Sequence, residues 1–186
     1  MHLVATPIGN IGDLSPRALA VLSDADLVLC EDTRVSAKLF GLCGIHRPLF
    51  AYHEHNAARV RPQIIERLRA GASVAVISDA GTPLVSDPGY KLVRDAIAAG
   101  IEVLAVPGPS AALAGLIVSG LPTDRFFVAG FLPTRRSARR RAIAELAPVP
   151  ATLIVFEAAR PAAVARELTK RFEEVRRGFA LSLIHI

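Results

Sequence analysis

Two short polar segments carry ionisable side chains, which can transfer protons, bind metal ions or supply a fixed charge. The segments are "CEDTR" (30–34) and "YHEHN" (52–56), and each directly follows an apolar run. The side chains in question are Glu31, Asp32, Arg34, His53, Glu54 and His55. Carboxylates and imidazoles are common general bases, and a guanidinium is a positive charge that can favour deprotonation nearby, so these six residues are the first candidates for a catalytic site.

A metal site is the alternative interpretation of the second segment. If the segment is extended, His53 and His55 share one face and Glu54 points to the other. No further ligand of suitable spacing accompanies them in the sequence. We therefore favour a substrate-facing or structural role and predict no metal.

A long loop, "SDAGTPLVSDPG" (78–89), follows the apolar run that ends at Ile77. Loops between a strand and a helix usually span about 2–6 residues, so this loop is unusually long. Its glycines allow close backbone approach and its prolines fix its shape, which suits one wall of a binding site. We interpret Asp87 as a helix N-cap, whereas Asp79 could either shape the loop or bind a ligand.

Two further loops have a similar composition. "TPIGN" (6–10) follows the first apolar run, and Gly108-Pro109-Ser110 precedes a helical pattern. Free N–H groups at that helix start could bind a carboxylate or a hydroxyl group. Neither loop has a phosphate fingerprint, because "TPIGNIGD" lacks a glycine triplet and the chain has no Walker A motif.

These loops require a scaffold that brings them to one edge. Apolar runs that alternate with helical patterns predict a parallel sheet with helices on both faces, an α/β fold. Since ligands of open α/β sheets bind outside the carboxyl ends of the strands, all of these loops belong to that edge. The runs expected to form strands are 2–5, 26–30, 49–52, 73–77, 102–106, 126–131 and 151–157.

The sequence predicts two domains of unequal completeness. We place the first at 1–118 and a partial second α/β domain at 119–180, with the boundary at "GLPTDR". Helices are expected to begin at Pro16, 57 and 88, the last after Asp87. The remaining segment, 181–186, is expected to be a non-native tail, because "LSLIHI" corresponds to one reading frame of a transposase adapter.

Composition narrows the class of protein. With 52% hydrophobic and 21% charged residues, the sequence is that of a folded protein, and no apolar stretch reaches the ~18 residues of a membrane span. We predict a cytoplasmic protein, because a secretory signal is absent from the N-terminus. Cys30 and Cys43 lack metal-ligand spacing and are interpreted as reduced thiols of the core.

The chain is basic, with a formal net charge of +5 and a pI of about 9.9. A GC-rich genome also produces an excess of arginine, so clustering carries more weight than the total. One cluster occurs in "TRRSARRR", on a predicted helix, and consists of Arg135, Arg136, Arg139, Arg140 and Arg141. It is either a solvated basic face or a surface that binds phosphates.

Several long motifs together resemble one family. They are "ATPIGNIGDLSPRAL", "CEDTR", "YHEHN", "SDAGTPLVSDPGYKLV", "VPGPSA", "SGLPTDRF", "GFLP" and "RELTKRFEE". The chain resembles, from Leu3 to about Gly178, the bacterial methyltransferases that modify the ribose 2′-hydroxyl of a decoding-centre cytidine in 16S ribosomal RNA. That family has the tetrapyrrole-methylase-like fold, and the resemblance implies S-adenosylmethionine between two α/β domains and a homodimer.

The resemblance also assigns residues to the cofactor. It implies that the long loop lines the S-adenosylmethionine site through Asp79, Gly81, Thr82, Pro83 and Leu84. It implies further contacts from the first loop, from the fifth and from a strand of the second domain. These contacts are Pro7, Ser110, Ala111, Ala112, Phe156 and Glu157.

The activity implied is direct transfer of a methyl group from sulfonium to oxygen without a metal, in which catalysis is mainly positioning. A base for the ribose hydroxyl, or a charge that favours its deprotonation, could be any of the six candidates named first, and the sequence does not choose among them. The arginine helix would contact phosphates of the small ribosomal subunit. The alternatives are a tetrapyrrole methylase, against which "YHEHN" and "RELTK" argue, and a non-catalytic RNA-binding remnant.

The chain departs from the family pattern near Glu157. The family continues there with a helix and a strand, whereas this chain passes from "EAARP" almost directly to "AAVARELTK". We therefore expect an internal deletion and a truncated second domain. Because the site needs both walls, we expect weak binding of S-adenosylmethionine, or none.

Overall fold

The computed structural model describes residues 1–85 and 89–157. These residues divide into two compact units, one formed by Met1–Ser110 and one by the described residues from Ala111 onward. The division therefore precedes the helix at 111–118, whereas the sequence boundary was placed after it. The expected deletion after Glu157 and the tail at 181–186 lie outside the described residues.

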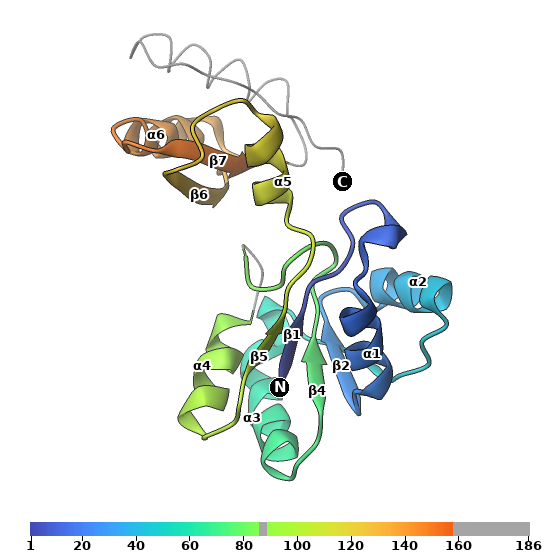
Figure 1. The fold of residues 1–186 in the computed structure, drawn as a ribbon. Coiled ribbons are helices and arrows are strands. Elements are labelled where there is room, and N and C mark those ends of the chain that lie inside the picture. Colours follow the sequence, from blue (N-terminus) through green and yellow to red (C-terminus); the bar gives the residue numbers. More distant parts are fainter. Residues whose placement is uncertain (86–88, 158–186) are drawn as a thin grey trace. The chain divides into compact units, whose positions relative to one another are not determined.

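The first unit contains a five-stranded sheet in which every pairing of neighbouring strands is parallel. The strand order is β3-β2-β4-β1-β5, so the first strand lies between the last two (Figure 1). All five strands begin within a residue or two of the positions expected from the sequence. Their bounds are His2–Val4 (β1), Leu27–Cys30 (β2), Leu49–Ala51 (β3), Val74–Val76 (β4) and Leu104–Val106 (β5).

Helices cover both faces of this sheet (Figure 1). One face packs against α3 and α4 through a core that includes Leu29, Ile64 and Leu92. The other packs against α1 and α2 around Leu22 and Phe40. The bounds are Ile11–Asp13 (η1, a 3₁₀ helix), Pro16–Asp24 (α1), Thr33–Cys43 (α2), Glu54–Arg69 (α3) and Tyr90–Ala98 (α4).

Local sequence explains where α1 begins. Ser15 is the N-cap, and its hydroxyl oxygen accepts a hydrogen bond from the Ala18 N–H at 3.1 Å. Pro16 occupies the first helical position, where its missing N–H costs nothing. The prediction for this helix start is confirmed.

Two other helix starts differ from prediction. The helix α3 begins at Glu54 rather than 57, because the Asn56 side chain accepts a hydrogen bond from the His53 N–H at 2.9 Å. The helix α4 begins at Tyr90, with Gly89 as its N-cap, so the expected start at 88 is wrong. Asp87, which we had interpreted as that cap, is outside the described residues.

The second unit has a β-α-β arrangement after an apolar helix. Its two strands pair in parallel, and Leu132, Ile143 and Ala147 form the buried centre against α6. The predicted strand at 126–131 and the helix on the arginine run are both confirmed. The elements are Ala111–Val118 (α5), Phe126–Phe131 (β6), Arg136–Leu146 (α6) and Thr152–Phe156 (β7).

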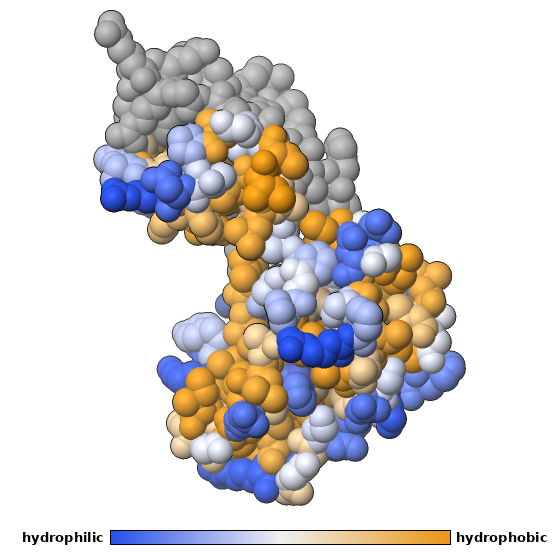
Figure 2. All heavy atoms as spheres, in the orientation of Figure 1, coloured by the Kyte–Doolittle hydropathy of each residue, from blue (hydrophilic) through white to orange (hydrophobic). Residues whose placement is uncertain are grey.

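Among its described residues, the second unit exposes more large apolar side chains than it buries. On α5, Ile117 and Val118 are 74% and 70% exposed, and Figure 2 shows apolar residues gathered over this helix. On β6, Phe131 is 61% exposed. No helix in the described part of the chain is long and apolar enough to cross a membrane.

Candidate functional site

The loops at the carboxyl edge of the sheet are joined by hydrogen bonds between backbones. Thr6, directly after β1, and Gly81, in the loop after β4, form an antiparallel bridge with N···O distances of 2.9 and 3.1 Å. The hydroxyl of Thr6, which is fully buried, donates to the Ser78 carbonyl at 3.2 Å. The Ser78 hydroxyl donates in turn to the Gly81 carbonyl at 3.1 Å. These contacts fix the shape of the long loop at its root.

Close packing accounts for the glycines of these loops. Gly81 has φ +83°, and an added Cβ would lie 3.2 Å from Ile8 Cγ2 and 3.5 Å from the Pro109 carbonyl oxygen. At Gly108 an added Cβ would lie 2.9 Å from the Ala5 Cβ. The Thr82 hydroxyl also donates to the Pro109 carbonyl at 3.0 Å. The loops after β1, β4 and β5 therefore form one packed rim.

Leu84 has an uncommon backbone conformation for a residue other than glycine. Its φ of 71° lies in the left-handed region. A Cβ added to Gly89 would lie 3.4 Å from the Leu84 Cγ, so the Leu84 side chain fills the space that Gly89 leaves. Leu84 follows Pro83, which is buried. Side-chain packing thus accompanies the strained turn in the long loop.

A hydrogen bond from a backbone N–H to a carboxylate joins the loops after β2 and β4. The Asp79 Oδ1 accepts a hydrogen bond from the Asp32 N–H at 3.1 Å. Asp32 is the N-cap of α2 and accepts from the Arg34 N–H at 2.8 Å. Its two oxygens also accept from the Arg34 guanidinium, at 3.0 and 2.6 Å. Hydrogen bonds from Arg34 lower the pKa of the Asp32 carboxyl to about 2; the bond from the guanidinium has the largest effect and that from the backbone N–H the next largest.

The "YHEHN" segment is the start of a helix and not an extended segment. His53 is the N-cap of α3, and Glu54 and His55 lie in the first helical turn. The predicted geometry, with Glu54 opposite the two histidines, is therefore wrong because the helix begins earlier than expected. The His53 and His55 rings are nevertheless close, with centroids 5.9 Å apart. Glu54 and His55 are exposed.

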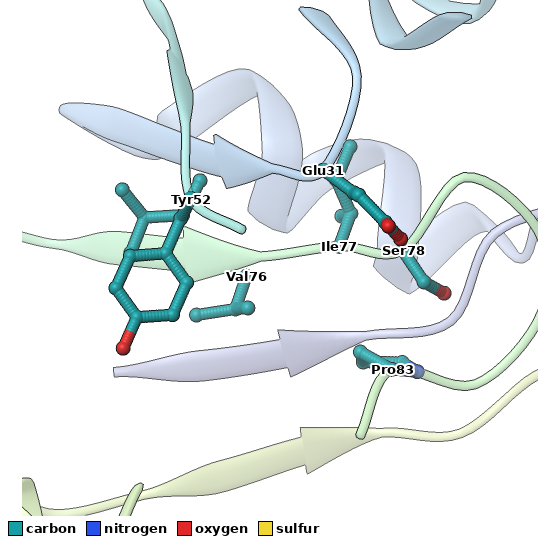
Figure 3. A pocket seen from close by; sticks show the side chains of 7 residues that line it. Glu31, Tyr52, Val76, Ile77, Ser78 and Pro83 are labelled. Carbon is teal, nitrogen blue, oxygen red and sulfur yellow. The ribbon is translucent and has the colours of Figure 1, made fainter. Parts of the chain in front are cut away.

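A pocket opens between the carboxyl ends of β2 and β4 (Figure 3). In Figure 3 the Glu31 carboxylate extends from the end of β2 toward the loop after β4. Tyr52 lies on the side of the pocket away from Glu31. Burial raises the pKa of the Tyr52 hydroxyl, although Arg61 acts in the opposite direction. The full lining is Leu29, Glu31, Tyr52, Val76, Ile77, Ser78 and Pro83.

The remaining cofactor candidates are divided between the units. Pro7 follows the Thr6 bridge and is half-buried, and Ser110 is the last residue of the first unit. Ala111 and Ala112 begin α5 in the second unit. Phe156 ends β7, with its ring centroid 5.4 Å from that of Phe131, and the half-buried Glu157 follows it. The candidates of the first unit lie in the rim loops described above.

The arginine helix contains both exposed and buried members. Arg139 is only 8% exposed, and its guanidinium donates to the Pro133 and Thr134 carbonyls at 3.4 and 3.1 Å. Placing Arg139 on an exposed basic face is therefore wrong, since Arg139 lies on the same helical stripe as Ile143 and Ala147. The exposed arginines are Arg135, Arg136, Arg140 and Arg141.

Sequence reasoning missed the buried hydroxyls of Thr6 and Ser78 and the pocket residue Tyr52. Each directly follows a strand or its last apolar residue, a position that could have been used to find them. Among the residues that the structure describes, no group of three or more His, Cys, Asp or Glu side chains could hold a metal ion.

Comparison with known proteins identifies the family to which this chain belongs. A family model for Tetrapyrrole (Corrin/Porphyrin) Methylases matches residues 1–181. The chain belongs to this family. Its relatives include proteins named Ribosomal RNA small subunit methyltransferase I. The Mesorhizobium japonicum protein is 53% identical over 96% of this chain, and that of Pseudomonas aeruginosa 48% identical over 95%. The chain spans 66% and 68% of the lengths of these two relatives.

Solved structures agree with the fold of the tetrapyrrole methylase family. A diphthine synthase superimposes with a TM-score of 0.66 at 18% identity, covering 94% of this chain and 72% of that protein. A uroporphyrin III C-methyltransferase from Thermus thermophilus superimposes with a TM-score of 0.58 at 22% identity, covering 91% and 75%. The predicted α/β, tetrapyrrole-methylase-like fold is confirmed.

Proposed function

We propose that this chain is an S-adenosylmethionine-dependent methyltransferase that modifies a ribose 2′-hydroxyl of a cytidine in 16S ribosomal RNA. The observation that carries the proposal is its similarity to proteins named Ribosomal RNA small subunit methyltransferase I, 48% to 53% identical over nearly the whole chain. The packed rim at the carboxyl edge of the sheet supports it, since ligands of open α/β sheets bind there.

The rim residues fit a positively charged cofactor. Among the first-unit residues proposed to hold S-adenosylmethionine, Asp79 is ionisable and none is cationic, so nothing in the set repels a sulfonium ion. Gly81 and Thr82 are held in place by the Thr6 and Pro109 backbones. The set consists of Pro7, Asp79, Gly81, Thr82, Pro83, Leu84 and Ser110, and the second unit would add Ala111, Ala112, Phe156 and Glu157.

When bound, S-adenosylmethionine supplies a methyl group that passes to the hydroxyl oxygen as its carbon–sulfur bond breaks. The chain contributes position: the rim fixes the donor site, and the loops after β2 and β3 provide polar groups for the acceptor. Asp32 and Arg34 stabilise each other and hold the loop after β2 against Asp79. We assign these two residues to the shape of the site and not to proton transfer.

The exposed arginines of α6 would provide affinity for RNA. Arg135, Arg136, Arg140 and Arg141 lie at its N-terminus and along its exposed side. Arginine binds phosphates through a planar fork of donors, which gives affinity without sequence selection. We expect binding of small-subunit RNA to weaken steeply as salt concentration rises. The proposed setting is the cytoplasm, with the protein acting as a homodimer and without a metal.

Radiolabel transfer tests the proposal. Purified chain is incubated with methyl-labelled S-adenosylmethionine and small ribosomal subunits that lack the modification. Label on a cytidine ribose is the expected result for an active chain, and unmodified large subunits are the control acceptor.

Two other outcomes favour the competing functions. RNA binding without label on the ribose would indicate a non-catalytic RNA-binding protein. Label on a uroporphyrinogen substrate, with none on RNA, would indicate a tetrapyrrole methylase. Either outcome would contradict the proposed function.

A further inference from the structure

Glu31 is the one candidate base that lines the pocket. Its backbone directly follows β2, and its carboxylate faces the loop after β4, which contributes Ser78 and Pro83 to the lining (Figure 3). No hydrogen bond or ion pair to this carboxylate occurs in residues 1–85 and 89–157. Because an ionised carboxylate has about four acceptor positions, Glu31 keeps its capacity to accept a hydrogen bond from a ligand.

The other acidic and basic candidates are occupied or lie elsewhere. The Asp32 carboxylate caps α2 and pairs with the Arg34 guanidinium at 2.6 Å, which makes it a weak base. Glu54 and His55 are exposed, as Glu31 is, but they lie on the first turn of α3, where the positive end of the helix dipole stabilises the Glu54 carboxylate. None of these four residues lines the pocket.

His53 is the main competitor of Glu31. Its Nδ1 is buried and has no hydrogen-bond partner among the described residues. It is the N-cap residue of α3 and does not line the pocket that contains Glu31 and Pro83. Pro83 belongs to the proposed cofactor set, so the pocket connects Glu31, and not His53, with the donor side of the site.

We propose that Glu31 binds the acceptor ribose 2′-hydroxyl and takes its proton during methyl transfer. This inference rests on the proposed function. The hydroxyl proton moves to the Glu31 carboxylate, the oxygen forms a bond to the methyl carbon, and the carbon–sulfur electron pair stays on sulfur. An anionic carboxylate and a sulfonium thus become a carboxylic acid and a neutral thioether, so charge and atoms balance.

The proposal predicts a preference that binding alone can measure. The probes are a short single-stranded RNA with one central cytidine and the same strand with 2′-deoxycytidine at that position. We expect the ribose strand to bind about tenfold more tightly, because a hydrogen bond to a charged group is stronger than a neutral one. Glu31→Ala should abolish the preference and leave the affinity for the deoxy strand unchanged, as measured by fluorescence anisotropy.

Two variants serve as matched controls. Glu66→Ala removes an exposed carboxylate from α3, away from the pocket, and should keep the preference. His53→Gln tests the competing imidazole. Loss of the preference in His53→Gln and its retention in Glu31→Ala would overturn the proposal, as would a wild-type chain without any preference. Thermal melts of all variants establish that they are folded.

The rate of label transfer separates this inference from the proposed function. If the chain is active, Glu31→Gln should reduce kcat by at least about 100-fold with little change in KM, which is the pattern for a lost general base. Unchanged kcat in Glu31→Gln overturns the role of Glu31 and leaves the function intact. A ribose preference that depends on Glu31, without any transfer, supports the binding role and contradicts the proposed function.

Discussion

The described residues of the two units differ in how completely they bury their parallel strands. In the first unit, all four residues of β2 and all three of β4 are buried, between two helical layers. In the second, every residue of β7 is partly exposed, and α6 covers a core centred on Leu132, Ile143 and Ala147. Parallel strands are normally buried on both faces, and the central strands of the first unit meet this requirement, whereas the described residues of the second unit do not bury β7.

This difference in burial predicts which of the two units is the more stable. The rim loops of the first unit rest on strands that cannot move without disturbing a large core. The described residues of the second unit form a small core and leave Ile117, Val118 and Phe131 exposed. We therefore expect the first unit to unfold cooperatively and the second to open at lower free energy.

Matched truncations of leucine test this comparison most strongly. Leu22→Ala, at a fully buried position of the first unit, should lower the free energy of unfolding by about 3 kcal/mol or more. Leu132→Ala in the second unit should cost less, about 2 kcal/mol, because a small core can collapse around the space. Urea unfolding with residue-resolved hydrogen exchange measures both, and equal costs would contradict the distinction.

A single methyl group on the rim should have the next largest effect. Gly81→Ala combines a φ of +83° with an approach of 3.2 Å to Ile8, so we expect a loss of about 1–3 kcal/mol. Gly41→Ala is the control, since an added Cβ there meets nothing within 4 Å and Gly41 lies inside α2. Chemical denaturation should show the control to be neutral or slightly stabilising, whereas a neutral Gly81→Ala would mean that the rim is not tightly packed.

Arginines of α6 should separate into structural and RNA-binding members. Arg139→Met should destabilise the second unit by about 1–2 kcal/mol, because the Pro133 and Thr134 carbonyls lose a charged donor. Arg136→Met should leave stability unchanged but lower the slope of log affinity against log salt by about 0.7 for single-stranded RNA. Filter binding over a salt series checks this, and identical behaviour of the two variants would remove the distinction.

The smallest effect is expected at the Asp32–Arg34 pair. Because the pKa of Asp32 is lowered to about 2 in the folded chain, against roughly 3.9 for a free aspartate, its contribution is present above pH 4. That contribution is lost as pH falls toward 2. Asp32→Asn should therefore be less stable than wild type at pH 6, and the difference should shrink steadily from pH 4 and disappear as pH falls through 2. A difference that does not depend on pH would show that the carboxylate charge is unimportant.

Much of the first unit could be predicted because its strands are nearly continuous apolar runs. The start of α3 was missed because Asn56 stands where a glutamate or glutamine usually completes a capping box, although its side chain makes the corresponding bond to the His53 N–H. The burial of Arg139 was missed because the charge run concealed its spacing of four residues from Ile143 and of eight from Ala147.

The loops that form the site could be predicted from the sequence, but the contacts between them could not. Parallel strands bring their carboxyl ends to one edge, which was enough to group the loops. Asp79 and Asp32 are 47 residues apart, and nothing local in either segment indicates that one carboxylate accepts from the other backbone. Whether Glu31 or its neighbour Asp32 lines the pocket likewise depends on which of the two becomes the N-cap of α2. Only the folded chain shows that this residue is Asp32.

The position of β1 has a consequence for synthesis on the ribosome. Residues 2–4 are synthesised before residues 75–76 and 104–106, with which they pair, so β1 has to wait for β4 and β5. At translation rates of ~5–20 residues per second, about 100 residues take roughly 5–20 s to make. During that interval β1 is without its partner strands, so chaperone binding to this segment should influence the yield of folded protein.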